Sequence, residues 1–241
     1  MRAGGERDGP HRGRGRAGHR WGSWPWTAFA DALLRKGAAK IYATARKPEP
    51  SENPRIVAEA LDVTDTKCVQ SLVERTGDVN IVFNNAGQLI QGPLLTSPLE
   101  AARATFDTNV FGALRIAQVY VPILARNGGG ALVNIHSLLS WASGAGAYGA
   151  SKAALWSLTN SLRLELAAQR TQVLGVHVGF VDTEMVASLN VPKISPDGVA
   201  ETVLEALSAG QNEVLVDPIT EKAKAALSGP VEDLALNRLT R

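Results

Sequence analysis

The stretch that decides the fold is Val133-Asn134-Ile135-His136-Ser137, followed closely by Ala147-Tyr148-Gly149-Ala150-Ser151-Lys152-Ala153-Ala154. The first segment closes an apolar run from residue 131, which is typical of a strand buried on both faces. The second segment opens a helical pattern that continues to residue 168. A buried strand that ends at a serine and leads into a long helix is one unit of an alternating α/β fold.

Strands and helices alternate on both sides of this unit. Apolar runs predict strands at residues 40–45, 55–61, 80–83, 131–135, 173–178 and 214–216. Helical spacing of apolar residues predicts helices over residues 28–36, 66–75, 99–126, 147–168 and 200–207. Continuously apolar strands separated by helices predict a parallel sheet with helices on both faces. The fold class we expect is therefore α/β, a doubly wound, Rossmann-like sheet in a single domain.

Three of the predicted helices carry boundary signals. Gly37 follows the first helix as a C-terminal cap. Asp65 precedes the second helix as its N-cap. Ser97 is expected to cap the helix over residues 99–126, with Pro98 in its first turn and Glu100 completing a capping box.

Polar or glycine-rich residues follow the ends of five predicted strands. They are Arg46, Asp62, the segment Asn84-Asn85-Ala86-Gly87, Ser137 and residues 179–183. The carboxyl ends of parallel strands meet at one edge of the sheet, which is where open α/β sheets bind their ligands. The sequence therefore predicts one functional site at this edge.

Tyr148 and Lys152 lie four residues apart at the start of a predicted helix, so their side chains share one face. A lysine ammonium beside a phenol favours the phenolate, so we expect Lys152 to lower the pKa of Tyr148 from about 10. Such a tyrosine can exchange a proton with a carbonyl or an alcohol. Ser137 can donate a hydrogen bond to the same substrate oxygen. Taken alone, the spacing also fits a surface helix whose aromatic residue packs inward.

Further motifs occur in register with this pair: Leu61-Asp62-Val63, Asn84-Asn85-Ala86-Gly87 and Thr108-Asn109-Val110-Phe111-Gly112. Over roughly residues 28–227 the sequence resembles the short-chain dehydrogenase/reductase family. Several independent motifs in one order argue against the simple surface helix. The resemblance implies an oxidoreductase that transfers a hydride between a nicotinamide dinucleotide and a carbonyl or alcohol substrate.

The resemblance implies a role for each member of a catalytic set. Tyr148 would be the proton donor or acceptor, and Lys152 would lower its pKa and hold the ribose next to the nicotinamide. Ser137 would orient the substrate carbonyl. Asn109 would hold a water molecule that links Lys152 to solvent.

The resemblance also implies a set of residues that bind the dinucleotide, from its adenine end to its nicotinamide end. They are Asp62, Val63, Asn84, Ala86, Gly87, Tyr148, Lys152, Val181 and Thr183. Asp62 and Val63 would contact the adenine. Val181 and Thr183 match the loop that contacts the nicotinamide carboxamide.

The choice between NAD and NADP depends on the end of the strand predicted at residues 40–45. Family members that prefer NAD place an acid there, whereas this chain has Thr44-Ala45-Arg46. Arg46 can form a charge-assisted contact with a 2′-phosphate. The alternative is an arginine that only faces solvent. We expect NADP in preference to NAD.

The N-terminal residues depart from the family pattern. The family opens with an apolar strand and the loop Thr-Gly-x-x-x-Gly-x-Gly, which lets the backbone approach a pyrophosphate at a helix N-terminus. That place here holds His19-Arg20-Trp21-Gly22-Ser23-Trp24-Pro25-Trp26, with no apolar strand before it. We expect the first strand and the glycine-rich loop to be degraded, because bulky indoles would fill the space that a pyrophosphate needs.

A shift of reading frame explains this departure. Tryptophan has the single codon TGG, so reading one nucleotide later gives glycine at Trp21, Trp24 and Trp26. The same shift turns His19 into Thr or Ile, which restores the family's loop in register. We therefore interpret residues 1–26 as a basic, Gly/Arg-rich tail, disordered or out of frame, joined to a Rossmann-type domain over residues 27–241. The alternative is a genuine variant with a basic, disordered arm.

Composition narrows the functional classes. Residues 1–20 carry six arginines and two acids, so the net charge of +2 divides into +4 on this tail and −2 on the remainder. The basic charge is therefore poor evidence for nucleic-acid binding, and no apolar run approaches the length of a membrane span. The single cysteine, Cys68, fits a reducing compartment, and we expect a cytoplasmic protein.

Other residues are expected to be structural. No spacing of Cys, His and Asp suggests a metal site, and we expect His136 and His177 to pack within the protein. Trp141 and Trp156 are expected to line the substrate mouth or a subunit interface. The helices over residues 99–126 and 147–168 resemble the family's subunit-contact helices, which predicts a homodimer or homotetramer. The alternative function is a catalytically impaired paralogue or a dinucleotide sensor, because the glycine-rich loop is missing.

Overall fold

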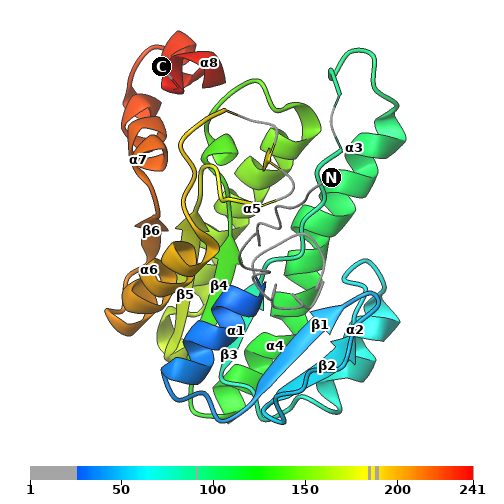
Figure 1. Cartoon of the computed structure of the whole chain (residues 1–241). Coiled ribbons are helices and arrows are strands. Elements are labelled where there is room, and N and C mark those ends of the chain that lie inside the picture. The colour runs from blue at the N-terminus through cyan, green and yellow to red at the C-terminus, as the bar shows by residue number, and fades with distance from the viewer. Residues whose placement is uncertain (1–25, 91, 184–185, 188–189, 241) are drawn as a thin grey trace, which may run out of the picture.

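Helices and strands alternate along the chain in the order that the sequence predicts (Figure 1). The computed structural model describes residues 26–90, 92–183, 186–187 and 190–240. The strands are β1 (Ile41–Ala45), β2 (Ile56–Ala60), β3 (Ile81–Asn84), β4 (Gly130–Ile135), β5 (Thr171–His177) and β6 (Glu213–Leu215). The helices are α1 (Trp26–Arg35), α2 (Thr66–Val73), α3 (Leu99–Phe106), α4 (Ala113–Arg126), α5 (Gly146–Glu165), α6 (Pro196–Ser208), α7 (Pro218–Ala225) and α8 (Leu236–Leu239).

The strands form two parallel sheets instead of the one that we expected. β1 pairs with β2, while β3, β4, β5 and β6 pair in that order. Figure 1 shows the two-stranded sheet beside the four-stranded one. Within the described residues, no strand pairs with the second edge of β1 or with the outer edge of β3. The segment predicted to hold a degraded first strand, residues 1–25, lies outside the described residues.

Helices cover both faces of the four-stranded sheet. Val133 and Leu174 point to the face covered by α1 and α6, and all of these elements share one apolar core. Their neighbours Leu132 and Val173 point to the opposite face, against α4 and the end of α5, because side chains alternate along a strand. A parallel sheet covered on both faces is the doubly wound, Rossmann-like architecture of a single domain, as predicted.

Two of the three boundary signals are confirmed and one is wrong. The Asp65 carboxylate accepts hydrogen bonds from the backbone N–H groups of Lys67 and Cys68, at 2.8 and 3.3 Å. Gly37 ends the first helical segment with a φ of 92°, a left-handed value that favours glycine. Ser97 does not cap α3. Because Pro98 has an extended ψ of 137° and itself holds the N-cap position, Ser97 lies one residue too early.

The helix predicted over residues 99–126 is interrupted near its middle. Residues Asp107–Gly112 form a wider π-helical turn between α3 and α4. A Cβ atom on Gly112 would lie 2.7 Å from Cγ2 of Val63, so only glycine allows this close approach. Such turns occur frequently at functional sites, and this one carries Asn109.

The same segment, Leu99–Arg126, is long and apolar enough to cross a membrane by length and composition, with a mean hydropathy of 1.2. Its apolar side instead faces the protein. Ile116, Tyr120 and Ile123 pack against α2 and the strand residue Val82. These are the contacts of a helix in a protein core.

Two C-terminal helices, α7 and α8, were not predicted. The sequence does indicate where α7 starts, because Asp217 is its N-cap and Pro218 occupies its first position. Asp217 accepts a hydrogen bond from the N–H of Thr220 at 2.9 Å in a complete capping box. The four residues of α8 are too few for a periodic signal.

Candidate active site

The predicted strand ends meet at one large cavity. It has a volume of about 1550 Å³ and runs between the two sheets, from the starts of β1 and β3 to the carboxyl ends of the strands. Its lining includes most of the residues that the sequence singles out: Arg46, Asp62, Val63, Asn84, Ala86, Gly87, Ser137, Tyr148, Lys152, Val181 and Thr183. Asn109 lies behind the wall and is fully buried. The structure brings these residues together, and their individual roles stay predictions.

Helix α5 and the end of β4 position three of these side chains. Tyr148 lies in the first turn of α5, and Lys152 lies one turn later. The Lys152 ammonium donates to the carbonyl of Ile135 at 2.8 Å and lies 5.8 Å from the centre of the Tyr148 ring. Ser137 follows β4, and its Oγ accepts a hydrogen bond from the N–H of Leu139 at 3.2 Å. Each side chain is therefore tied to a rigid element.

Burial dominates the protonation of the Tyr148–Lys152 pair. It raises the pKa of Tyr148 to about 12, and the hydrogen bond with Ser137 opposes this rise only in part. Burial also lowers the pKa of Lys152 to about 8. The expectation that Lys152 lowers the pKa of Tyr148 is therefore wrong for this structure, because the loss of water around the phenol is the larger effect. Tyr148 holds its proton at neutral pH.

Asn109 connects the cavity wall to α5. Its side chain donates to Ser151 Oγ at 2.9 Å and to the carbonyl of Gln88 at 3.1 Å, and its Oδ1 accepts from the Gln88 N–H at 2.7 Å. Ser151 in turn donates to the carbonyl of Tyr148 at 2.7 Å. Asn109 thus fixes the segment after β3 against the helix that carries Tyr148. Sequence reasoning missed Gln88 and Ser151, although Ser151 stands within the quoted motif.

The Asn84 side chain turns away from the cavity. It is buried and donates to the carbonyl of Ala113 at 3.1 Å and to Oδ1 of Asn134 at 3.0 Å. Asn134 donates onward to the hydroxyl of Thr159 at 2.8 Å. The amide nitrogen of Asn84 therefore ties β3 to α4 and, through Asn134, to β4 and α5, while the residue still lines the cavity.

Asp62 and Arg46 lie at the opposite end of the cavity. The Asp62 carboxylate accepts hydrogen bonds from the hydroxyl and the N–H of Thr64, at 2.6 and 2.9 Å. These bonds lower the pKa of Asp62, and the charge of the exposed Arg46 contributes further. This end of the cavity therefore holds an ionised carboxylate and a solvent-exposed guanidinium.

Comparison with known proteins decides the family. A sequence profile of the family described as short chain dehydrogenase matches residues 27–193. The chain belongs to the short-chain dehydrogenase family. It is therefore an oxidoreductase by family, and the matched region carries every residue of the predicted site.

Individual short-chain dehydrogenases resemble most of the chain. One from Burkholderia cenocepacia, solved in complex with NADP, is 33% identical, with a TM-score of 0.83 over 91% of this chain and 94% of that one. One from Streptomyces avermitilis is 26% identical, with a TM-score of 0.76 over 88% of this chain and 90% of that one. An uncharacterized oxidoreductase of Staphylococcus aureus is 29% identical over 207 residues, which cover 78% of this chain and 90% of the relative.

The dinucleotide of short-chain dehydrogenases fits the described cavity at its two ends. Asp62 and Val63 line one end, and Tyr148 and Lys152 line the other. A Cβ atom on Gly87 would lie 3.8 Å from the Lys152 ammonium, in ordinary van der Waals contact, so Gly87 lies directly beside that charge. In the sequence, residues 19–26 hold tryptophans where the family has phosphate-binding glycines. Residues 19–25 of that stretch lie outside the described residues.

The two core histidines and two tryptophans lie behind Ser137. His136 and His177 are buried as expected, with ring centres 4.7 Å apart. Trp141 is 7% exposed and stacks on His177 at 3.9 Å, while Trp156 meets it edge-on. Neither tryptophan lines the described cavity, so the expectation that they line the substrate mouth is wrong. Trp141 is buried beneath the serine, where its apolar ring avoids water. A subunit contact through the half-buried Trp156 stays a prediction.

We expect His136 to make the protein sensitive to acid. Burial lowers its pKa well below the usual range, and its ring nitrogens have no hydrogen-bond partner within the described residues. Below about pH 6.5 the unfolded chain binds a proton that the folded chain excludes, so stability falls by up to about 1.4 kcal/mol per pH unit. Replacing His136 with phenylalanine should flatten this dependence. Urea unfolding at about pH 7.5 and about pH 5.5 gives the free energy of unfolding of each protein at both pH values. If this free energy fell by the same amount in both proteins between the two pH values, the assignment to His136 would be wrong.

Proposed function

We propose that this protein is an NADP-dependent reductase of carbonyl compounds. The carrying observation is the convergence of Ser137, Tyr148 and Lys152 on one cavity wall, with Arg46 at the far end. Bound NADPH would supply the hydride for the carbonyl carbon. Ser137 would hold the carbonyl oxygen by a hydrogen bond, and Tyr148 would give that oxygen its proton. The high pKa of Tyr148 favours this direction, because a protonated phenol is the form that donates.

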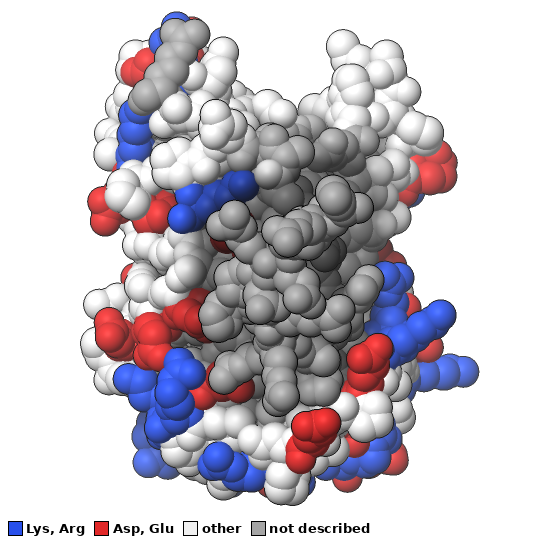
Figure 2. Space-filling model, viewed as in Figure 1, with Lys and Arg blue, Asp and Glu red and all other residues white. Residues whose placement is uncertain are grey.

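Turnover of NADPH with a panel of aldehydes and ketones tests the proposal. Loss of NADPH absorbance with at least one carbonyl, and formation of the matching alcohol, is the expected result. The panel should emphasise apolar carbonyls, because Leu94 and Leu95, in the loop before α3, are 66% and 98% exposed. Figure 2 shows that this upper right lobe is mostly uncharged. Absence of turnover with every carbonyl by a chain that binds NADPH would overturn the proposal.

We expect Arg46 to set the preference for NADPH over NADH. Replacing Arg46 with alanine removes the charge-assisted contact with the 2′-phosphate, so the ratio of the two affinities should fall roughly tenfold to a hundredfold. Fluorescence titration with each dinucleotide gives both dissociation constants. Lys47→Ala is the matched control, since it removes a neighbouring positive charge. An equal loss in both variants would mean that Arg46 acts only through general charge.

A second candidate function is a catalytically impaired paralogue or a dinucleotide sensor. Its supporting observation is the tryptophan-containing stretch in place of the glycine-rich loop. The family match begins at residue 27, next to the proposed boundary between the tail and the dehydrogenase domain. The DNA sequence of codons 19–27 tests the frameshift. If the +1 reading frame there does not encode the glycine motif, the frameshift interpretation is wrong.

We further propose a cytoplasmic homodimer or homotetramer that uses the helices α4 and α5. Phe111, at the start of this helical region, and Leu164, near the end of α5, are 49% and 80% exposed. A subunit contact through these helices would cover both side chains. Light scattering on the purified chain would read the oligomeric state, and a monomer would contradict the assembly. We propose neither a nucleic-acid nor a membrane partner.

A further inference from the structure

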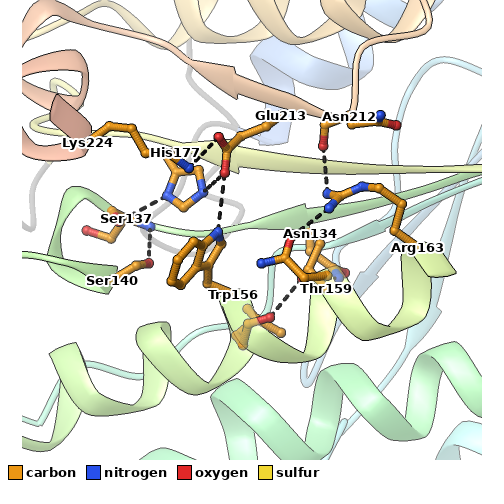
Figure 3. A network of polar contacts seen from close by, with 12 residues as sticks. Asn134, Ser137, Ser140, Trp156, Thr159, Arg163, His177, Asn212, Glu213 and Lys224 are labelled. Atoms are coloured by element: carbon orange, nitrogen blue, oxygen red, sulfur yellow. Dashed lines mark hydrogen bonds and ion pairs between the residues drawn. The ribbon is translucent and has the colours of Figure 1, made fainter. Parts of the chain in front are cut away.

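A polar cluster lies next to Ser137, and its members Trp156, His177, Glu213 and Lys224 do not line the cavity (Figure 3). His177 is fully buried, whereas the side chains of Glu213 and Lys224 are 29% and 34% exposed. The centre of the cluster is Glu213, the first residue of β6. One carboxylate oxygen of Glu213 accepts from the indole N–H of Trp156 at 3.2 Å and lies 3.3 Å from Nε2 of His177. The other accepts from the Lys224 ammonium at 2.7 Å. Glu213 is thus a single carboxylate that three other elements contact.

Two of these contacts lead to the catalytic constellation. Nδ1 of His177 lies 3.4 Å from the backbone carbonyl oxygen of Ser137. Trp156 lies on α5 one turn after Lys152 and two turns after Tyr148, so all three share one face of that helix. Glu213 is therefore linked through one residue to Ser137 and through another to the helix that carries Tyr148.

The linking side chains are closely held. His177 is fully buried between the rings of His136 and Trp141. The Lys224 ammonium lies 4.8 Å from the centre of the Trp141 ring and 5.2 Å from that of Trp156. Packing on every side leaves the His177 imidazole little freedom to move away from either oxygen.

The protonation of His177 decides how many of its contacts are hydrogen bonds. Both of its neighbours, the Ser137 carbonyl and the Glu213 carboxylate, are acceptors only, so a neutral imidazole donates to one and an imidazolium to both. Burial lowers the pKa of His177 and the charge of Lys224 from α7 adds to this, whereas Glu213 from β6 opposes the shift only in part. His136 from the end of β4, with Lys152 and Arg163 from α5, are the other titratable groups facing this pair of rings. Protonation of His177 therefore adds one donor between these two acceptors.

We propose that Glu213 is a positioning residue for the active site, holding Ser137 through His177 and the Tyr148–Lys152 helix through Trp156. The geometry sets the distance between the hydroxyl that orients the substrate and the phenol that moves its proton. Glu213 does not touch the cavity, so its effect reaches the reaction only through these two links. The kinetic part of the proposal rests on the proposed reductase function, whereas the geometric part does not.

The test is Glu213→Gln in the full chain, read by the NMR signals of the tyrosine ζ carbons. The chain has three tyrosines, of which Tyr148 contacts Ser137 while Tyr42 and Tyr120 lie on β1 and α4. We expect the Tyr148 signal to shift, because a displaced Ser137 changes the hydrogen bond with the phenol, and the Tyr42 and Tyr120 signals to stay. Glu201→Gln is the matched control, since it makes the same chemical change in an exposed ion pair with Arg35. It should move none of the three signals.

A second variant covers the possibility that Glu213→Gln does not fold. Trp156→Phe keeps an aromatic ring in the same place and removes only the N–H that bonds Glu213, so it should shift the Tyr148 signal in the same direction. In an active enzyme, Glu213→Gln should lower kcat roughly tenfold to a hundredfold, with little change in KM for NADPH. A Tyr148 signal that stays unchanged in both variants would overturn the proposal. A shifted signal in a chain without turnover would instead keep the positioning role and reject the reductase.

Discussion

Replacing Tyr148 with phenylalanine is expected to abolish turnover and leave the fold intact. The sequence motif places the phenol at the cavity wall as the proton donor to a substrate oxygen. Positioned proton transfer contributes roughly a hundredfold to ten-thousandfold to a rate. The ring itself remains, so the packing at the start of α5 is kept. We therefore expect kcat to fall by about 10³-fold with the unfolding transition little changed. Initial rates and thermal unfolding measure the two effects.

Tyr42→Phe is the matched control for this variant. Its hydroxyl donates to Asp78 at 2.8 Å on the edge of the small sheet, away from Ser137 and Lys152. Turnover should survive in Tyr42→Phe. If Tyr148→Phe kept more than about a tenth of the rate, another group would be donating the proton and the assignment of Tyr148 would be wrong.

Restoring the glycine-rich loop is expected to produce the largest gain in cofactor affinity. Backbone N–H groups at the start of a helix bind phosphate oxygens directly. Hydrogen bonds to a charged group contribute about 1.5–3 kcal/mol each, so several of them should strengthen NADPH binding by at least about 100-fold. The variant replaces the residues before Thr27 by those read in the +1 frame. Fluorescence titration with NADPH compares it with the present chain.

The control for the restored chain carries the same segment with its glycines changed to alanine. Alanine methyl groups would hold the backbone away from the phosphates, so the gain should largely disappear. Equal NADPH affinity in the present and restored chains would show that the cavity binds the dinucleotide without the loop. Failure of both to bind would contradict the enzymatic interpretation of the whole domain.

The order of elements could be predicted from the sequence because each depends on short-range patterns. Apolar runs mark the strands, and Asp65 marks a helix start through contacts two and three residues away. The convergence of Ser137, Tyr148 and Lys152 followed from the rule that parallel strands end at one edge. Local chemistry and one topological rule were sufficient for these features.

Features that depend on several distant segments could not be predicted. The inward turn of Asn84 requires Asn134 and Thr159, which come from two other elements. The raised pKa of Tyr148 depends on how much water the finished cavity wall excludes, which sequence spacing does not report. Glu213 contacts Trp156 across 57 positions of the chain, so no local pattern pointed to it.

The division of the sheet has a consequence for how the chain behaves while it folds. Within the described residues, β1 and β3 each leave a row of backbone N–H and C=O groups without a strand partner. Such exposed strand edges favour aggregation, because an extended segment of another chain can form hydrogen bonds with them. Newly made chains would meet one another through these rows, and aggregation would then compete with folding as concentration rises. The divided sheet would therefore lower the yield of soluble protein before it changed any catalytic rate constant.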